Sequence, residues 1–152
     1  MGLGDPTVPH SPQPVSGKRQ RLARLALVVP NYDQALAFYV GTLGFTCVED
    51  TAYPEEAKRW VVVRPPGAEP GEGAELILAQ ARDDHQRSRI GDQTGGRVFL
   101  FLETDDFERD FATYSAAQVE FVRPPRDFPY GRVAVFRDPF GNLWDLIEPG
   151  GD

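Results

Sequence analysis

The stretch Arg24-Leu25-Ala26-Leu27-Val28-Val29 is the key to the fold, because its pattern and everything that follows it occur twice in the chain. Its alternation predicts a β-strand that ends at Pro30. Asn31, with Gln34 three residues later, is typical of a helix start, and Gly44 is typical of a helix end. Three further strands are predicted at residues 45–49, 59–64 and 75–79. This order makes one βαβββ module.

The second half of the chain repeats the order. Residues 97–102 predict a strand, and Thr104 or Asp105 is expected to cap a helix that carries Phe107, Phe111 and Tyr114. Strands are predicted at 119–122, 132–136 and 143–147. The 73-residue shift that carries Arg24 onto Arg97 also carries Arg59 onto Arg132. We predict an α+β fold in which two tandem βαβββ modules form a cupped, barrel-like mixed sheet with helices on the outside.

The chain is expected to hold one domain after an N-terminal tail. Residues 1–21 have prolines at positions 6, 9, 12 and 14 and lack apolar periodicity, which predicts a disordered tail. Residues 22–152 form the single predicted domain, with module one at 22–95 and module two at 96–149.

Charge and composition exclude several functions. The net charge of the 152 residues is −7, and because residues 1–22 carry +2, the remainder carries −9. This sign argues against nucleic-acid binding, and the absence of a long apolar run argues against a membrane span. The single cysteine, Cys47, allows no internal disulfide or cysteine-based zinc site, and we expect it to be structural and at least partly buried. A cytoplasmic setting is expected.

Two sequence motifs resemble those of a known protein family. Residues 35–39 (ALAFY) with 43–45 (LGF), and residues 138–146 (DPFGNLWDL), resemble the vicinal oxygen chelate superfamily of glyoxalase I, bleomycin-resistance proteins and extradiol dioxygenases. The resemblance covers residues 22–149. Each motif also has a structural interpretation. The first motif would consist of helix residues that pack on the sheet, and the second would contain a type I turn at 138–141.

The resemblance implies four metal-ligand positions, which fall on Arg24, Ile77, Arg97 and Asp145. Of these, only Asp145 can ligate a metal, since arginine stays protonated and offers no lone pair. At ~7 Å and an effective dielectric near 20, each guanidinium would cost a divalent cation roughly 5 kcal/mol. An alternative register supplies Glu75 as a second carboxylate but keeps both arginines. No cofactor is expected, and a divalent metal stays a minor alternative.

Arg24 and Arg97 then have two interpretations. One is an ion-pair cluster in which Asp145 and Glu75 neutralise them; the other adds an anionic ligand held by the two guanidinium groups. Alternation places Phe99 and Phe101 on the face of Arg97, and Ala26 and Val28 on that of Arg24. The resemblance further implies that the pocket walls include Trp60, Val62, Val133 and Val135. For Trp60, packing in the core is the alternative interpretation. Weaker candidates for ligand contact, expected in loops over the mouth of the pocket, are Tyr53, His85 and Tyr130.

Two functions follow. The first is a glyoxalase/bleomycin-resistance-like protein that binds a small anionic molecule in a metal-free pocket through Arg24, Arg97, Trp60, Phe99 and Phe101. The alternative is a glyoxalase-like enzyme, a lyase, isomerase or dioxygenase, which is metal-dependent in one version. In the metal-free version, the arginines would stabilise an enolate and Asp145 would move a proton. The resemblance also implies a homodimer, in some relatives with exchanged modules.

Overall fold

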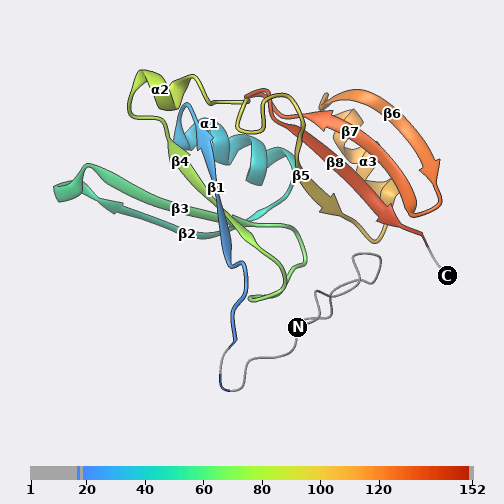
Figure 1. The fold of residues 1–152 in the computed structure, drawn as a ribbon, viewed down its shortest axis with the longest axis horizontal. Helices are drawn as coiled ribbons and strands as arrows, with labels where there is room; N and C mark the ends of the chain where they lie inside the picture. Colours follow the sequence, from blue (N-terminus) through green and yellow to red (C-terminus); the bar gives the residue numbers. More distant parts are fainter. Residues whose placement is uncertain (1–16, 18, 151–152) are drawn as a thin grey trace, which may run out of the picture.

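A computed structural model describes residues 17 and 19–150 of the chain (Figure 1). Most of the predicted tail, residues 1–21, lies outside the described residues. Module one contains β1 (Arg24–Val29), α1 (Tyr32–Leu36) with a π-helical continuation (Ala37–Thr42), β2 (Thr46–Tyr53), a 3₁₀ turn (Pro54–Glu56), β3 (Lys58–Arg64) and β4 (Glu75–Gln80). A linker with the short α2 (Asp84–Arg87) leads to module two. Its elements are β5 (Val98–Glu103), α3 (Phe107–Ala116), β6 (Glu120–Phe128), β7 (Gly131–Arg137) and β8 (Leu143–Pro149).

The predicted duplication is confirmed by the sheets. Module one has the strand order β1-β4-β3-β2 and module two has β5-β8-β7-β6, with the first and last strands parallel in each. The 73-residue shift carries β3 onto β7 along their whole length. It fails after them, because residues 65–74 join β3 to β4 whereas only residues 138–142 join β7 to β8.

The α+β class and the cupped sheets are confirmed, but the eight strands form two separate sheets. In the described part of the chain, no closed barrel is present. The hairpin of β2 and β3 projects from module one, away from module two (Figure 1). No helix among the described residues is long and apolar enough to cross a lipid bilayer.

Local capping explains where the helices begin. The Asn31 side chain accepts a hydrogen bond from the Gln34 backbone N–H at 3.0 Å, as the sequence predicts. The start of α3 differs from the prediction, because its N-cap is Asp106 and not Thr104 or Asp105. The Asp106 carboxylate accepts a hydrogen bond from the Arg109 backbone N–H at 3.0 Å. Thr104 lies two residues earlier, where its hydroxyl accepts from the Asp106 N–H.

The two modules share one hydrophobic core. Tyr39, from the π-helical segment of module one, is fully buried and lies against Phe140 and Trp144 of module two. Phe45 also meets Trp144, which stacks on Phe136. The side chains on the helix-facing side of each sheet therefore pack into this core. The opposite faces lie outside this core cluster.

Candidate functional site

Each sheet of the molecule has one face outside the shared core. In β3, Val61 and Val63 belong to the core cluster, whereas Trp60, Val62 and Arg64 alternate onto the other side. Strand pairing extends that side to β4 and β1. We call it the open face of module one; it comprises Arg24, Ala26, Trp60, Val62, Arg64, Glu75 and Ile77.

At one end of this open face, Glu75 joins two arginines. Arg24 Nε lies 3.3 Å from one Glu75 carboxylate oxygen, and Arg64 Nη1 lies 3.2 Å from the other. Arg64 and Glu75 are largely buried, while the Arg24 side chain is 40% exposed. Two guanidinium groups and one carboxylate leave a surplus of one positive charge, and Arg64 Nε has no acceptor among the described residues.

At the other end of the open face, Trp60 lines a hollow of about 260 Å³ together with Tyr53. Tyr53 is the last residue of β2, not a loop residue as expected, and it is 45% exposed. The hollow lies on the projecting hairpin (Figure 1), and its rim carries charged side chains. These are Glu49, Glu56 and Lys58.

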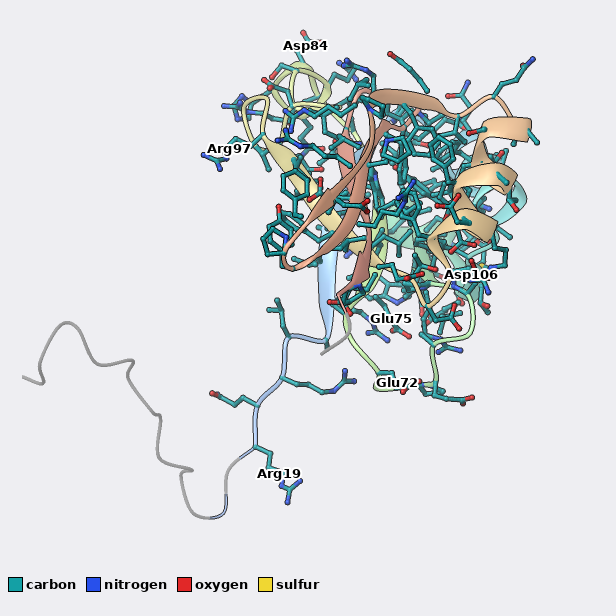
Figure 2. The ribbon with its side chains drawn as sticks, turned by 90° about the vertical axis from the view of Figure 1, so that its right-hand side faces the viewer. Arg19, Glu72, Glu75, Asp84, Arg97 and Asp106 are labelled. Atoms are coloured by element: carbon teal, nitrogen blue, oxygen red, sulfur yellow. The ribbon has the colours of Figure 1, made fainter. Side chains whose placement is uncertain are left out.

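Arg97 does not join Arg24 within one chain. It precedes β5, its side chain is exposed, and Figure 2 shows it projecting from the end of the molecule where Asp84 lies, well away from Glu75. Because Arg24 contacts Glu75, the two predicted arginines occupy different ends of the molecule. Arg64 takes the place beside Arg24 that the sequence analysis assigned to Arg97.

A β-bulge separates Phe99 from Phe101. The pairing of β5 with β8 shifts between Val98 and Leu100, so Phe101 lies opposite Asp145 while Phe99 packs against the core. The alternation expected for these two residues is therefore wrong. Phe101 is 67% exposed, and it shares its face with Asp145.

Asp145 and Val135 pair across β8 and β7, so Asp145 lies on the face of module two that is turned away from the core. Val133 and Val135, expected from the resemblance to line the pocket, are buried and stand outside the core cluster. Partial burial raises the pKa of the Asp145 carboxyl, and the nearby Arg123 guanidinium opposes this rise.

A further hollow, larger than the one beside Trp60, lies between the modules and has the wrong charge for an anion. It measures about 860 Å³ and is formed by the β3–β4 connection, the end of β5 and the start of α3. Phe101 contributes to it. Its acidic side chains outnumber the single arginine, Arg109, which is paired with Asp105 and Asp110. The four acidic residues are Glu72, Glu103, Asp105 and Asp110.

Three other side chains considered from sequence lie outside these sites. Cys47 is exposed on β2, not buried as expected, and its thiol pKa is raised, which makes it a poor nucleophile at neutral pH. His85 is exposed on α2. Tyr130 is exposed in the β6–β7 turn, where it stacks on Phe128.

The sequence of this chain matches a known protein family. Residues 21–146 match the model of the Glyoxalase/Bleomycin resistance protein/Dioxygenase superfamily. The chain belongs to this superfamily. An uncharacterized protein from Shewanella frigidimarina (strain NCIMB 400) is 52% identical over 130 residues, covering 86% of this chain and 94% of the relative.

Solved structures agree with the superfamily assignment. The crystal structure of UcmS2 superposes with a TM-score of 0.71 at 28% identity, covering 86% of this chain and 99% of that chain. TnmS3, an antibiotic binding protein from Streptomyces sp. CB03234, superposes with a TM-score of 0.68 at 29% identity, covering 87% of this chain and 98% of that chain.

The positions at which metal-dependent members of the superfamily are expected to hold a metal do not suit one here. They carry Arg24, Ile77, Arg97 and Asp145, a set with a single oxygen ligand. Within the described ranges, no three His, Cys, Asp or Glu side chains gather to form a metal-binding cluster. The donor chemistry thus fits an anion better than a cation.

Arg64 is the residue that the sequence analysis missed. The signal was present, because Arg64 follows Trp60 and Val62 at alternate positions of one strand and those two were expected to face the pocket. What the sequence could not show is that β4 begins with Glu75 directly beside it, since residues 65–74 intervene.

Proposed function

We propose that this superfamily member binds a small anionic molecule, without a metal, at the arginine end of the open face of module one. Arg24 and Arg64 would hold the anion, and Glu75 would position both guanidinium groups. The surplus positive charge of this triad is the observation that carries the proposal. Guanidinium forks match carboxylate and phosphate oxygens in geometry as well as charge.

Placement of the triad favours a ligand over a purely structural role. Glu75 shares its two oxygens between two arginines, so neither guanidinium has all its donors used by this carboxylate. Arg24 is 40% exposed and adjoins the exposed Ala26, which leaves the anion a path from solvent. A closed ion-pair cluster would need a second acid.

Binding is favoured over catalysis by the residue types at the four family positions. An arginine guanidinium offers no acceptor lone pair and Ile77 has no titratable group, so among these four residues only Asp145 could move a proton. A relative that superposes well, TnmS3, is described as an antibiotic binding protein. Both points support binding.

We also propose a homodimer in which module two of one copy covers the open face of module one of the other. In a single chain the open face has no cover from module two, whose own outer face presents Phe101 and Asp145. Such a dimer would bring Arg97 and Asp145 toward Arg24, as the family positions imply. The site would then be completed only by the second copy.

Thermal denaturation with carboxylates and inorganic phosphate tests the proposal. At ~100 times its Kd, a bound anion stabilises the folded state by about 2.7 kcal/mol, which raises Tm by roughly 5–10 °C for a chain of this size. We expect Arg24→Gln to abolish that shift. Chloride at equal ionic strength serves as the salt control.

Arg137→Gln is the matched control variant. Arg137 is also a strand arginine, 45% exposed, with one glutamate partner, Glu120, at 3.4 Å. It should keep the full shift. If no anion raises Tm, or if Arg24→Gln keeps the shift, the proposed function is wrong. If Arg24→Gln abolishes the shift but Arg97→Gln leaves it intact, the anion site stands and the dimeric arrangement is wrong.

A further inference from the structure

The open face of module one carries opposite chemistry at its two ends. The triad of Arg24, Arg64 and Glu75 is net positive, whereas the hollow beside Trp60 has two acidic residues against one lysine on its rim. An anionic group is therefore attracted to the first end and repelled from the second. A neutral aromatic ring has the reverse preference, because Trp60 and Tyr53 offer ring surface for stacking.

The hollow is smaller than most pockets that enclose a complete ligand. Its volume of about 260 Å³ falls below the roughly 300–1,000 Å³ typical of pockets that enclose a complete small molecule. It suits one part of a molecule, such as a ring system, whose remainder continues along the sheet.

The strand geometry gives the distance between the two ends. Trp60 and Arg64 lie four residues apart on β3, and at about 3.3 Å per residue they are separated by roughly 13 Å along the strand. Val62 and Ile77, paired across β3 and β4, lie between them; Val62 is fully buried and Ile77 is partly exposed, so the neighbouring side chains form most of the surface there. Glu49 of β2 pairs with Val62, so one carboxylate flanks this stretch on the side of the hairpin.

We infer that the ligand is an elongated aromatic acid: its ring system occupies the hollow between Tyr53 and Trp60, and its carboxylate or phosphate lies about 13 Å away on Arg24 and Arg64. This inference rests on the proposed anion site. It adds that the ligand has a ring system, that about 13 Å separates this ring system from the anionic group, and that the ligand lies along β3 in one orientation.

Calorimetric titration of the full chain with a probe series tests the inference. The probes are naphthylhexanoate, which has ring, chain and charge; hexanoate, without the ring; naphthoate, without the chain; and naphthylhexanol, without the charge. We expect naphthylhexanoate to bind about tenfold tighter than each of the other three, a difference of roughly 1.4 kcal/mol. Hexanoate lacks the ring that stacks, naphthylhexanol lacks the charge that the arginines bind, and naphthoate lacks the chain that joins the two ends.

Variants at the two ends should separate the contributions. Trp60→Leu and Tyr53→Leu should each weaken naphthylhexanoate binding several-fold and leave hexanoate binding unchanged, while Arg24→Gln should weaken both. Tyr53 is 45% exposed, so its replacement leaves the core intact. Tyr130→Leu is the matched control, since Tyr130 is a 61% exposed aromatic residue outside the open face.

The outcomes distinguish this inference from the proposed function. If hexanoate binds as tightly as naphthylhexanoate and both need Arg24, the anion site stands and the elongated ligand is wrong. If naphthylhexanol binds as tightly as naphthylhexanoate and Arg24→Gln has no effect, both the anion site and the two-ended ligand are wrong. The same holds if none of the four probes binds.

Discussion

Asp138 links the two modules through hydrogen bonds. Its carboxylate is 2% exposed and accepts hydrogen bonds from the Phe140 and Asn142 backbone N–H groups, the Asn142 amide, the Trp144 indole and the Tyr39 hydroxyl. Tyr39 comes from module one and the other donors from module two. A residue that looks like a turn-former in sequence thus also joins the two halves.

Removing the Tyr39 hydroxyl should destabilise the fold. Tyr39→Phe deletes one hydrogen bond to a buried carboxylate without changing the ring, and we expect the free energy of unfolding to fall by about 1–3 kcal/mol. Tyr130→Phe is the control, because the Tyr130 side chain is 61% exposed. Chemical denaturation measures both. Equal stability of the two variants would contradict the assigned role of the bond to Asp138.

The same pair should affect stability at high pH. Burial, and next to it the negative charge of Asp138, raise the pKa of Tyr39 well above its ordinary value. The unfolded phenol ionises above pH ~10 while the folded one stays neutral, so stability is complete below that pH and declines above it by about 1.4 kcal/mol per pH unit. Above pH ~10, unfolding of Tyr39→Phe should show a slope that is shallower by up to that amount; an unchanged slope would refute the assignment.

Between the modules, the linker is an element with a strict requirement for glycine. Gly91 has φ +73°, and a side chain at this position would clash with the carbonyl oxygen of Phe140. The linker therefore touches the turn that contains Asp138. Gln93, two residues later, bonds to the Val28 N–H and the Ala26 carbonyl at the edge of β1.

Gly91→Ala and Gly95→Ala form a matched pair within this linker. Both glycines have positive φ, but a Cβ at Gly95 would have no described atom within 4 Å. We expect Gly95→Ala to cost about 1–2 kcal/mol of backbone strain, and Gly91→Ala about 2–5 kcal/mol once the clash is added. Thermal melts of both variants measure the difference; similar melting temperatures would show that the linker gives way without cost.

In the molecule as a whole, the shared core takes up one face of each sheet, and the other face lies outside that core, with Val62, Val133 and Val135 buried there. Phe101 on the outer side of module two is 67% exposed, which is unusual for so large an apolar residue. A second copy that covers this side would bury it. The proposed homodimer accounts for that exposure and for the separation of Arg97 from Arg24 within one chain.

Sedimentation of the purified protein tests the homodimer. We expect a dimer at micromolar concentration, and we expect Phe101→Glu to shift it toward monomer because the charge would have to be desolvated in the interface. Tyr130→Glu is the control, since Tyr130 has a similar exposure and stacks within its own module. A wild-type monomer, or equal dissociation of the two variants, would overturn the dimer.

Local patterns in the chain were enough to predict the modules, the order of their elements and the beginning of the first helix, because alternation and capping act over a few residues. The partners of the charged groups depended instead on tertiary structure. Tyr39 meets Asp138 across 99 residues, and Arg64 meets Glu75 across the β3–β4 connection. The bulge in β5, which turns Phe101 away from Phe99, depends on pairing with β8. Such contacts follow from how the sheets pair and pack, which no local pattern encodes.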